Sequence, residues 1–217
     1  MRLNQYIDHT ILKAVATPMD IKNLCLEANT HEFYAICVNS GYVNLAVSML
    51  KDSRVKVAAV VGFPLGAMST EVKVAEALYC VENGADEIDM VINIGLLKAK
   101  HSKAVEDEIK EIKDAIGDKV LKVIIETCYL TNEEKRAACM AAVNAGAEFV
   151  KTSTGFGTGG ATIEDVKLMK EVVGNKAKIK ASGGIKDRKT AMEYIKLGIL
   201  RLGTSAGIEL VTETEEN

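Results

Sequence analysis

The chain has 217 residues, of which 48% are hydrophobic and 26% charged, and its formal net charge is −3. We expect a single domain over residues 1–217, and so small a negative charge argues against nucleic acid or an anionic membrane as a partner. The N-terminus lacks an apolar leader, the longest apolar run is too short to cross a bilayer, and the five cysteines form no CxxC pair. A cytoplasmic protein fits these features best.

Eight apolar runs recur along the chain and predict short buried strands. They lie at residues 6–12, 33–38, 55–61, 87–92, 120–125, 148–151, 177–180 and 199–202. Helical patterns separate most of these runs, and Thr17, Thr131 and Thr162 each stand three positions before an acidic residue, as in a capping box. Glycines 84, 146 and 198 precede strands and suit left-handed helix ends.

This alternation of strand and helix predicts a parallel sheet, and eight units predict a single (β/α)8 TIM barrel. An open, doubly wound sheet is the alternative. That fold normally carries a G-x-G-x-x-G phosphate fingerprint after its first strand, and nothing similar follows Leu12. In a barrel, the polar residues at the carboxyl ends of the strands form the active face.

Lys151 ends an apolar run and is followed by hydroxyl residues and a glycine-rich turn that includes Thr154 and Gly155. A buried ammonium is costly unless an anion compensates its charge or it loses its proton. Lys151 is therefore a candidate nucleophile or anion partner, with a lysine that extends to solvent as the alternative.

Lys180 closes the seventh predicted strand, which neighbours the strand of Lys151 in a barrel. Two adjacent ammonium groups disfavour each other's charge, so one of them can serve as a free amine that attacks carbonyls. Asp89 lies in an otherwise apolar strand and points toward the catalytic end, where it either takes part in catalysis or neutralises a buried lysine.

Glycine-rich segments follow the last two predicted strands. Gly183 and Gly184 come after the seventh strand, while Gly203, Thr204 and Ser205 come after the eighth. Loops at these two positions form the usual phosphate site of this barrel, so together they favour a phosphorylated substrate.

Several motifs, in order from Tyr6 to Gly207, resemble those of the deoxyribose-phosphate aldolase family. They are YIDHTILK (6–13), AICV (35–38), VGFPLG (61–66), GADEID (84–89), KVIIET (122–127), FVKTSTGF (149–156), KASGGI (180–185) and RLGTS (201–205). The resemblance implies a class I aldolase that needs no cofactor. It would cleave 2-deoxy-D-ribose 5-phosphate reversibly to D-glyceraldehyde 3-phosphate and acetaldehyde.

By position, Lys151 resembles the family's Schiff-base lysine, Lys180 its second lysine, and Asp89 its proton-relay aspartate. Cys37 resembles the family's cysteine that lines the aldehyde pocket, and Asp8 and Thr10 resemble polar residues beside it. For these three residues, core packing and strand-end hydrogen bonds are an equal alternative. The loops of Thr154, Gly155, Gly183, Gly184, Gly203, Thr204 and Ser205 are expected to bind the substrate.

The chain departs from some relatives at two places. Ala206 stands where a second serine follows the Gly203 turn, so the phosphate would depend more on backbone donors. The C-terminus has no tyrosine, and we expect its acidic tail to be disordered from about residue 211.

Two rival functions stay open on the residues alone. The three histidines have no metal-ligand spacing, which disfavours a metal-assisted aldolase or isomerase. A non-catalytic sugar-phosphate-binding barrel would not need the complete set of two lysines and an aspartate. The sequence leaves the oligomeric state open, a homo-oligomer included.

Overall fold

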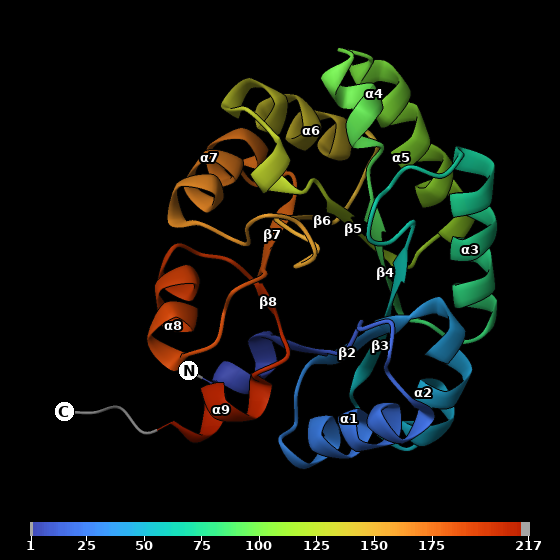
Figure 1. Cartoon of the computed structure of the whole chain (residues 1–217), viewed down its shortest axis with the longest axis vertical. Helices are drawn as coiled ribbons and strands as arrows, with labels where there is room; N and C mark the ends of the chain where they lie inside the picture. Colours follow the sequence, from blue (N-terminus) through green and yellow to red (C-terminus); the bar gives the residue numbers. More distant parts are fainter. Residues whose placement is uncertain (1, 214–217) are drawn as a thin grey trace.

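The computed structural model describes residues 2–213. Its eight strands are all parallel and close into a barrel in the order β1 to β8, with β1 pairing β8. Helices surround the strands (Figure 1). The predicted (β/α)8 TIM barrel is therefore confirmed. The strands are β1 (Ile7–Thr10), β2 (Ala35–Asn39), β3 (Lys56–Val61), β4 (Glu87–Val91), β5 (Val120–Ile124), β6 (Phe149–Lys151), β7 (Lys178–Ser182) and β8 (Arg201–Thr204).

The helices begin where the capping residues predict. Thr17 and Thr131 both form complete capping boxes, and the Thr162 hydroxyl accepts from the Asp165 N–H. The α-helices are α1 (Pro18–Thr30), α2 (Val43–Met49), α3 (Thr70–Glu82), α4 (Ile94–Lys98), α5 (Ser102–Ile116), α6 (Asn132–Asn144), α7 (Ile163–Val173), α8 (Arg188–Lys196) and α9 (Gly207–Thr212). Short 3-10 turns occupy Leu3–Tyr6, Ser40–Tyr42 and Thr127–Tyr129.

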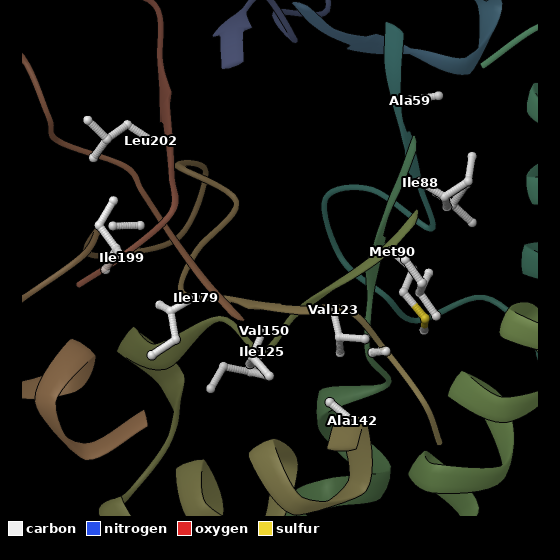
Figure 2. Close-up of a cluster of buried hydrophobic side chains, with 14 of the residues drawn as sticks. Ala59, Ile88, Met90, Val123, Ile125, Ala142, Val150, Ile179, Ile199 and Leu202 are labelled. Atoms are coloured by element: carbon white, nitrogen blue, oxygen red, sulfur yellow. The ribbon is translucent and has the colours of Figure 1, made fainter. Parts of the chain in front are cut away.

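Side chains alternate along each strand between the helices and the barrel interior. The outward set forms the main hydrophobic core between strands and helices (Figure 2), and it includes Ile88, Met90, Val123, Val150 and Ile179. The inward set on the same strands is largely charged. The apolar side chains of the strands thus pack against the helices, and the charged side chains lie inside the barrel.

The last two strands extend further than the apolar pattern predicted. β7 continues to Ser182 and β8 to Thr204, and Ser182 pairs with Gly203. Lys180 is therefore the central residue of its strand instead of the last one, and Gly203 and Thr204 belong to a strand. The apolar pattern stopped short because these ladder residues are small or polar.

The C-terminal expectation needs a correction. α9 runs to Thr212, so residues 211 and 212 are helical and Leu210 is fully buried. The rest of the expected tail, residues 214–217, lies outside the described residues. Within residues 2–213, no helix combines the length and apolar character that crossing a membrane requires.

Candidate active site

Among residues 2–213, seven charged side chains are buried inside the barrel, each at most 5% exposed. They come from six of the eight strands, because inward positions on neighbouring strands converge on the barrel axis. These residues are Asp8, Glu87, Asp89, Lys122, Lys151, Lys180 and Arg201.

Asp89 is the centre of this group. Its Oδ2 accepts from Lys151 Nζ at 2.8 Å and from Lys180 Nζ at 2.9 Å, and its Oδ1 accepts from Lys122 Nζ at 2.6 Å. One carboxylate oxygen therefore holds both predicted lysines. The structure brings together the three residues that the sequence singled out as catalytic.

Asp8 and Arg201 extend the network from Lys180. Lys180 Nζ donates to Asp8 Oδ2, and the Arg201 guanidinium donates to Asp8 Oδ1 at 3.1 Å. Arg201 also makes a two-pronged contact with Glu87, with 3.0 Å for each N–O pair, while Lys122 Nζ lies 2.6 Å from Glu87 Oε2. Asp8 is thus a fully buried member of the charged network and does not line the cavity at the carboxyl ends of the strands.

These contacts decide which groups are ionised. Burial would raise the pKa of Asp89, but the ammonium groups of Lys122, Lys151 and Lys180 hold it well below its usual value. Burial lowers the pKa of Lys180, yet the Asp8 and Asp89 carboxylates raise it above its ordinary value overall. Lys180 is therefore an ammonium at neutral pH.

A cavity of about 730 Å³ opens above the network at the carboxyl ends of β1, β6, β7 and β8. Lys151 lines this cavity, whereas Lys122 and Lys180 lie beneath its floor and are fully buried. Most of the predicted binding residues share the lining: Thr10, Thr154, Gly155, Gly183, Gly184, Gly203, Thr204 and Ser205. Lys151 is thus the member of the buried lysine group that a ligand in the cavity can reach.

The expected phosphate loops form one wall of the cavity. Gly183 and Gly184 have φ values of +86° and +80°, a conformation that glycine adopts without strain. The Thr204 hydroxyl is already engaged, because it donates to the Ile185 carbonyl at 2.7 Å and accepts from the Ala206 N–H. The backbone of this wall is consequently a better candidate anion ligand than the Thr204 side chain.

The other predicted contact residues occupy different depths. Cys37 is fully buried and packs with Leu12, Ala58 and Val60, and burial raises the pKa of its thiol. The Thr10 hydroxyl donates to the Asp8 carbonyl at 2.7 Å. Cys37 is therefore a neutral thiol packed inside the barrel. The hydrogen bond of Thr10 stabilises the end of β1.

Thr154 is held by Glu126 through its hydroxyl and its backbone N–H, so this carboxylate anchors the loop after Lys151. Glu126 itself has a left-handed φ of 53°. The loop that follows the candidate nucleophile is thereby fixed at its first turn.

Sequence reasoning missed Lys122 and Arg201 as members of the buried network. A usable signal existed for Lys122, since it interrupts an apolar strand as Asp89 does and pairs with it in register. The contact of Arg201 with Glu87 joins β8 to β4, which are not neighbouring strands. Only the closed barrel reveals it.

No group of three or more histidine, cysteine, aspartate or glutamate side chains in residues 2–213 is arranged to hold a metal ion.

Comparison with known proteins decides the family. A family model described as DeoC/LacD family aldolase matches residues 2–204. A deoxyribose-phosphate aldolase from Carboxydothermus hydrogenoformans is 58% identical over 214 residues, covering 97% of this chain and 94% of that protein. One from Finegoldia magna is 58% identical over 211 residues, covering 97% and 99%. The chain belongs to the DeoC/LacD aldolase family.

Solved structures agree with this assignment. The tetrameric deoxyribose phosphate aldolase of Aeropyrum pernix superposes with a TM-score of 0.89 at 31% identity, covering 96% of this chain and 89% of that one. The family resemblance expected from the motifs is thus confirmed. The roles of individual residues in this aldolase stay predictions.

Gly203 gives a first prediction for this aldolase. A Cβ at position 203 would lie 2.9 Å from Ser182 Cβ and 3.1 Å from Lys180 Cε. We expect Gly203→Ala to displace Lys180 and lower kcat by ~10²-fold, with a stability loss of about 1–3 kcal/mol. Gly41→Ala is the matched control, since nothing lies within 4 Å of that added methyl. An unchanged kcat for Gly203→Ala would contradict the expected displacement of Lys180.

Acid stability gives a second prediction. The pKa values of Asp8 and Asp89 are lower in the folded chain than their ordinary 3.8, so each carboxylate stabilises the fold above pH 3.8. This contribution is lost as the pH falls through the lower folded values. Chemical denaturation should give a constant difference in unfolding free energy between the chain and Asp89→Asn from pH 7 to about 4, shrinking below that. A difference that shrinks between pH 7 and 5 would contradict the ion pairing.

Proposed function

We propose that this chain cleaves 2-deoxy-D-ribose 5-phosphate reversibly to D-glyceraldehyde 3-phosphate and acetaldehyde through a Schiff base on Lys151, without a cofactor. One observation carries the proposal. The Lys151 amine lines the cavity while it shares Asp89 Oδ2 with the charged Lys180, which lies beneath the floor. The names of the relatives from Carboxydothermus and Finegoldia support the substrate.

The chemistry starts at the substrate's aldehyde carbon, C1. The Lys151 nitrogen adds to C1 to give a carbinolamine, and loss of water leaves a protonated iminium. When the 3-hydroxyl loses its proton, the C2–C3 bond breaks and its electron pair moves to C2, neutralising the iminium as an enamine. D-Glyceraldehyde 3-phosphate then leaves, C2 takes a proton, and water releases acetaldehyde from Lys151.

Asp89 and Lys180 are the groups proposed to move protons in these steps. Asp89 contacts the Lys151 nitrogen directly, so it can accept and return a proton as the carbinolamine forms and loses water. Lys180 shares the same carboxylate oxygen and can replenish that proton. The two residues need no movement of the backbone to do so, since both lie inside strands.

The phosphate of the substrate is proposed to rest against Gly183, Gly184, Gly203 and Ser205. These residues line the same cavity as Lys151, so one molecule can contact both. Backbone N–H groups exposed by glycines at positive φ are suited to phosphate oxygens. Thr154 and Gly155 line the same cavity as Lys151 and are proposed to contact the sugar carbons.

A turnover assay tests this function. With 2-deoxy-D-ribose 5-phosphate, we expect enzyme-coupled detection to show glyceraldehyde 3-phosphate and acetaldehyde in equal amounts, at a rate that a chelator does not change. Removing the phosphate should raise KM far more than it lowers kcat, because the phosphate contacts lie away from the bonds that change. Binding without turnover would instead favour the non-catalytic sugar-phosphate-binding barrel.

We also propose that the chain functions in the cytoplasm and assembles into a homo-oligomer. All five cysteines are free thiols, which suits a reducing compartment. The related deoxyribose phosphate aldolase from Aeropyrum pernix is tetrameric, which supports an assembly here. Light scattering coupled to size-exclusion chromatography measures this, and the mass of a single 23.4 kDa chain would contradict it.

A further inference from the structure

The loop that follows the candidate nucleophile is attached at both of its ends to the exit of the neighbouring strand. It spans residues 152–161, between β6 and α7, and we call it the nucleophile loop. Its first residues hydrogen-bond Ser182, the last residue of β7. At its other end, the Ala161 N–H donates to the carbonyls of Ser182 at 3.0 Å and of Gly183 at 3.1 Å. The nucleophile loop and the end of β7 are therefore held to each other at two places.

Ser182 makes three hydrogen bonds to the start of the nucleophile loop. Its hydroxyl donates to the Ser153 carbonyl at 2.6 Å, and its N–H donates to the Thr152 hydroxyl at 3.1 Å. The Thr152 hydroxyl in turn donates to the Ser182 carbonyl at 3.1 Å. All three residues are buried, so water cannot easily take the place of a partner that is removed.

The two segments also pack backbone against backbone. A Cβ added at Gly160 would overlap the Gly183 carbonyl oxygen. One added at Gly183 would lie 2.9 Å from the Gly160 Cα and 3.6 Å from the Gly155 Cα. Because no side chain separates them, a displacement of one segment must displace the other.

The attached segments carry the two ends of the candidate site. Lys151 directly precedes the nucleophile loop, and Gly183 and Gly184 belong to the wall proposed to bind the phosphate. Ser182 lines the same cavity and stands between them in the chain and in the fold. Gly203 of β8 closes the other side, since a Cβ there would lie 2.9 Å from Ser182 Cβ. Ser182 is thus enclosed by the strands on both sides.

We propose that Ser182 is a positioning residue that fixes the spacing between Lys151 and the phosphate wall, and thereby gives the chain its preference for a phosphorylated sugar. This inference rests on the function proposed above. When the phosphate is held by Gly183 and Gly184, C1 of the sugar reaches the amine only if this spacing is kept. A sugar without phosphate is not held at that end and can adjust its own position.

Replacing Ser182 with alanine tests the proposal, because it removes the hydrogen bond to the Ser153 carbonyl and leaves the backbone in place. We expect kcat/KM for 2-deoxy-D-ribose 5-phosphate to fall ~10-fold, mainly through kcat, and that for 2-deoxy-D-ribose to change by less than about twofold. Each half of the site should stay intact. The rate at which acetaldehyde plus borohydride labels Lys151, and the Kd of inorganic phosphate measured by calorimetry, should both stay within about twofold.

Ser40→Ala is the matched control. It also removes one partly buried serine hydrogen bond, to Glu76 at 2.7 Å, but it lies after β2, away from the nucleophile loop. The ratio of the two kcat/KM values should not change in this variant.

A second pair of variants keeps the test decisive if Ser182→Ala does not fold. Thr152→Val removes the hydroxyl that bridges the N–H and the carbonyl of Ser182 while it nearly preserves the shape of the side chain. It should lower the preference for the phosphorylated sugar as Ser182→Ala does. Thr152→Ser keeps the hydroxyl and should keep the preference.

Three results would overturn the proposal. An equal fall for both sugars would mean that Ser182 supports the fold alone. A weaker affinity for inorganic phosphate that accounts for the whole loss would mean that it only shapes the wall. An unchanged ratio would mean that the spacing does not depend on it. Failure of the proposed function looks different, since the unaltered chain would then cleave neither sugar, and this inference would fall with it.

Discussion

Replacing Lys151 with methionine is expected to abolish aldol cleavage, lowering kcat by at least ~10⁴-fold, because no other described lysine of the buried network reaches the cavity. Methionine has a similar length and fills the same space. The charge ring of Asp8, Arg201, Glu87, Lys122, Asp89 and Lys180 stays complete, so the thermal midpoint should fall little or rise.

The matched control is Lys178→Met, another inward lysine, on the neighbouring strand and two residues before Lys180. Its side chain is exposed at the opposite end of the barrel, so kcat should change by less than about twofold. Steady-state kinetics and thermal unfolding of both variants give the comparison. Turnover by Lys151→Met within tenfold of the unaltered chain would mean that the nucleophile lies elsewhere.

Lys180→Leu is expected to lower kcat by ~10³-fold at neutral pH, for two reasons that act together. The proton relay loses the cation that shares Asp89 with Lys151. Asp8 and Asp89 also lose the ammonium that bridges them, so Asp89 is held less firmly against Lys151.

Steady-state kinetics at neutral pH measures the loss, with Lys178→Met on the same strand as the control. Near-normal activity at neutral pH would contradict both reasons. The stability loss, about 3–5 kcal/mol for a broken buried pair, is measured separately by denaturant unfolding.

The barrel could be predicted from sequence because its signals are local. Capping threonines, glycines at helix ends and apolar runs each report on a few neighbouring residues, and their alternation fixed the number of units. Strand ends were the weak point. Ser182 and Gly203 continue the ladder in the structure, but their small or polar side chains give no apolar signal.

The site was predictable in part for the same reason. Lys151, Lys180 and Asp89 each stand at the end of, or within, an apolar run, and neighbouring strands bring the two lysines together. The ring depends on contacts across the barrel, such as the 114-residue separation between Arg201 and Glu87. The tilt and stagger of the closed sheet decide these contacts, and no local pattern encodes them.

A buried network of this kind also explains why a charged barrel interior is compatible with a stable fold. Every ring carboxylate is paired with two cations at hydrogen-bond distance, so the cost of burying the charges is offset by their mutual attraction. Lys151, in contrast, pairs with a single carboxylate, that of Asp89, and it lies at the cavity wall, where a substrate can reach its nitrogen.

The most direct test of this account is covalent trapping. The intact chain is incubated with acetaldehyde and reduced with borohydride, and the labelled peptides are mapped by mass spectrometry. The account predicts a single added ethyl group on Lys151, in the peptide that contains residues 149–156, and none in Lys151→Met. Label on Lys122 or Lys180, or no label in the intact chain, would contradict it.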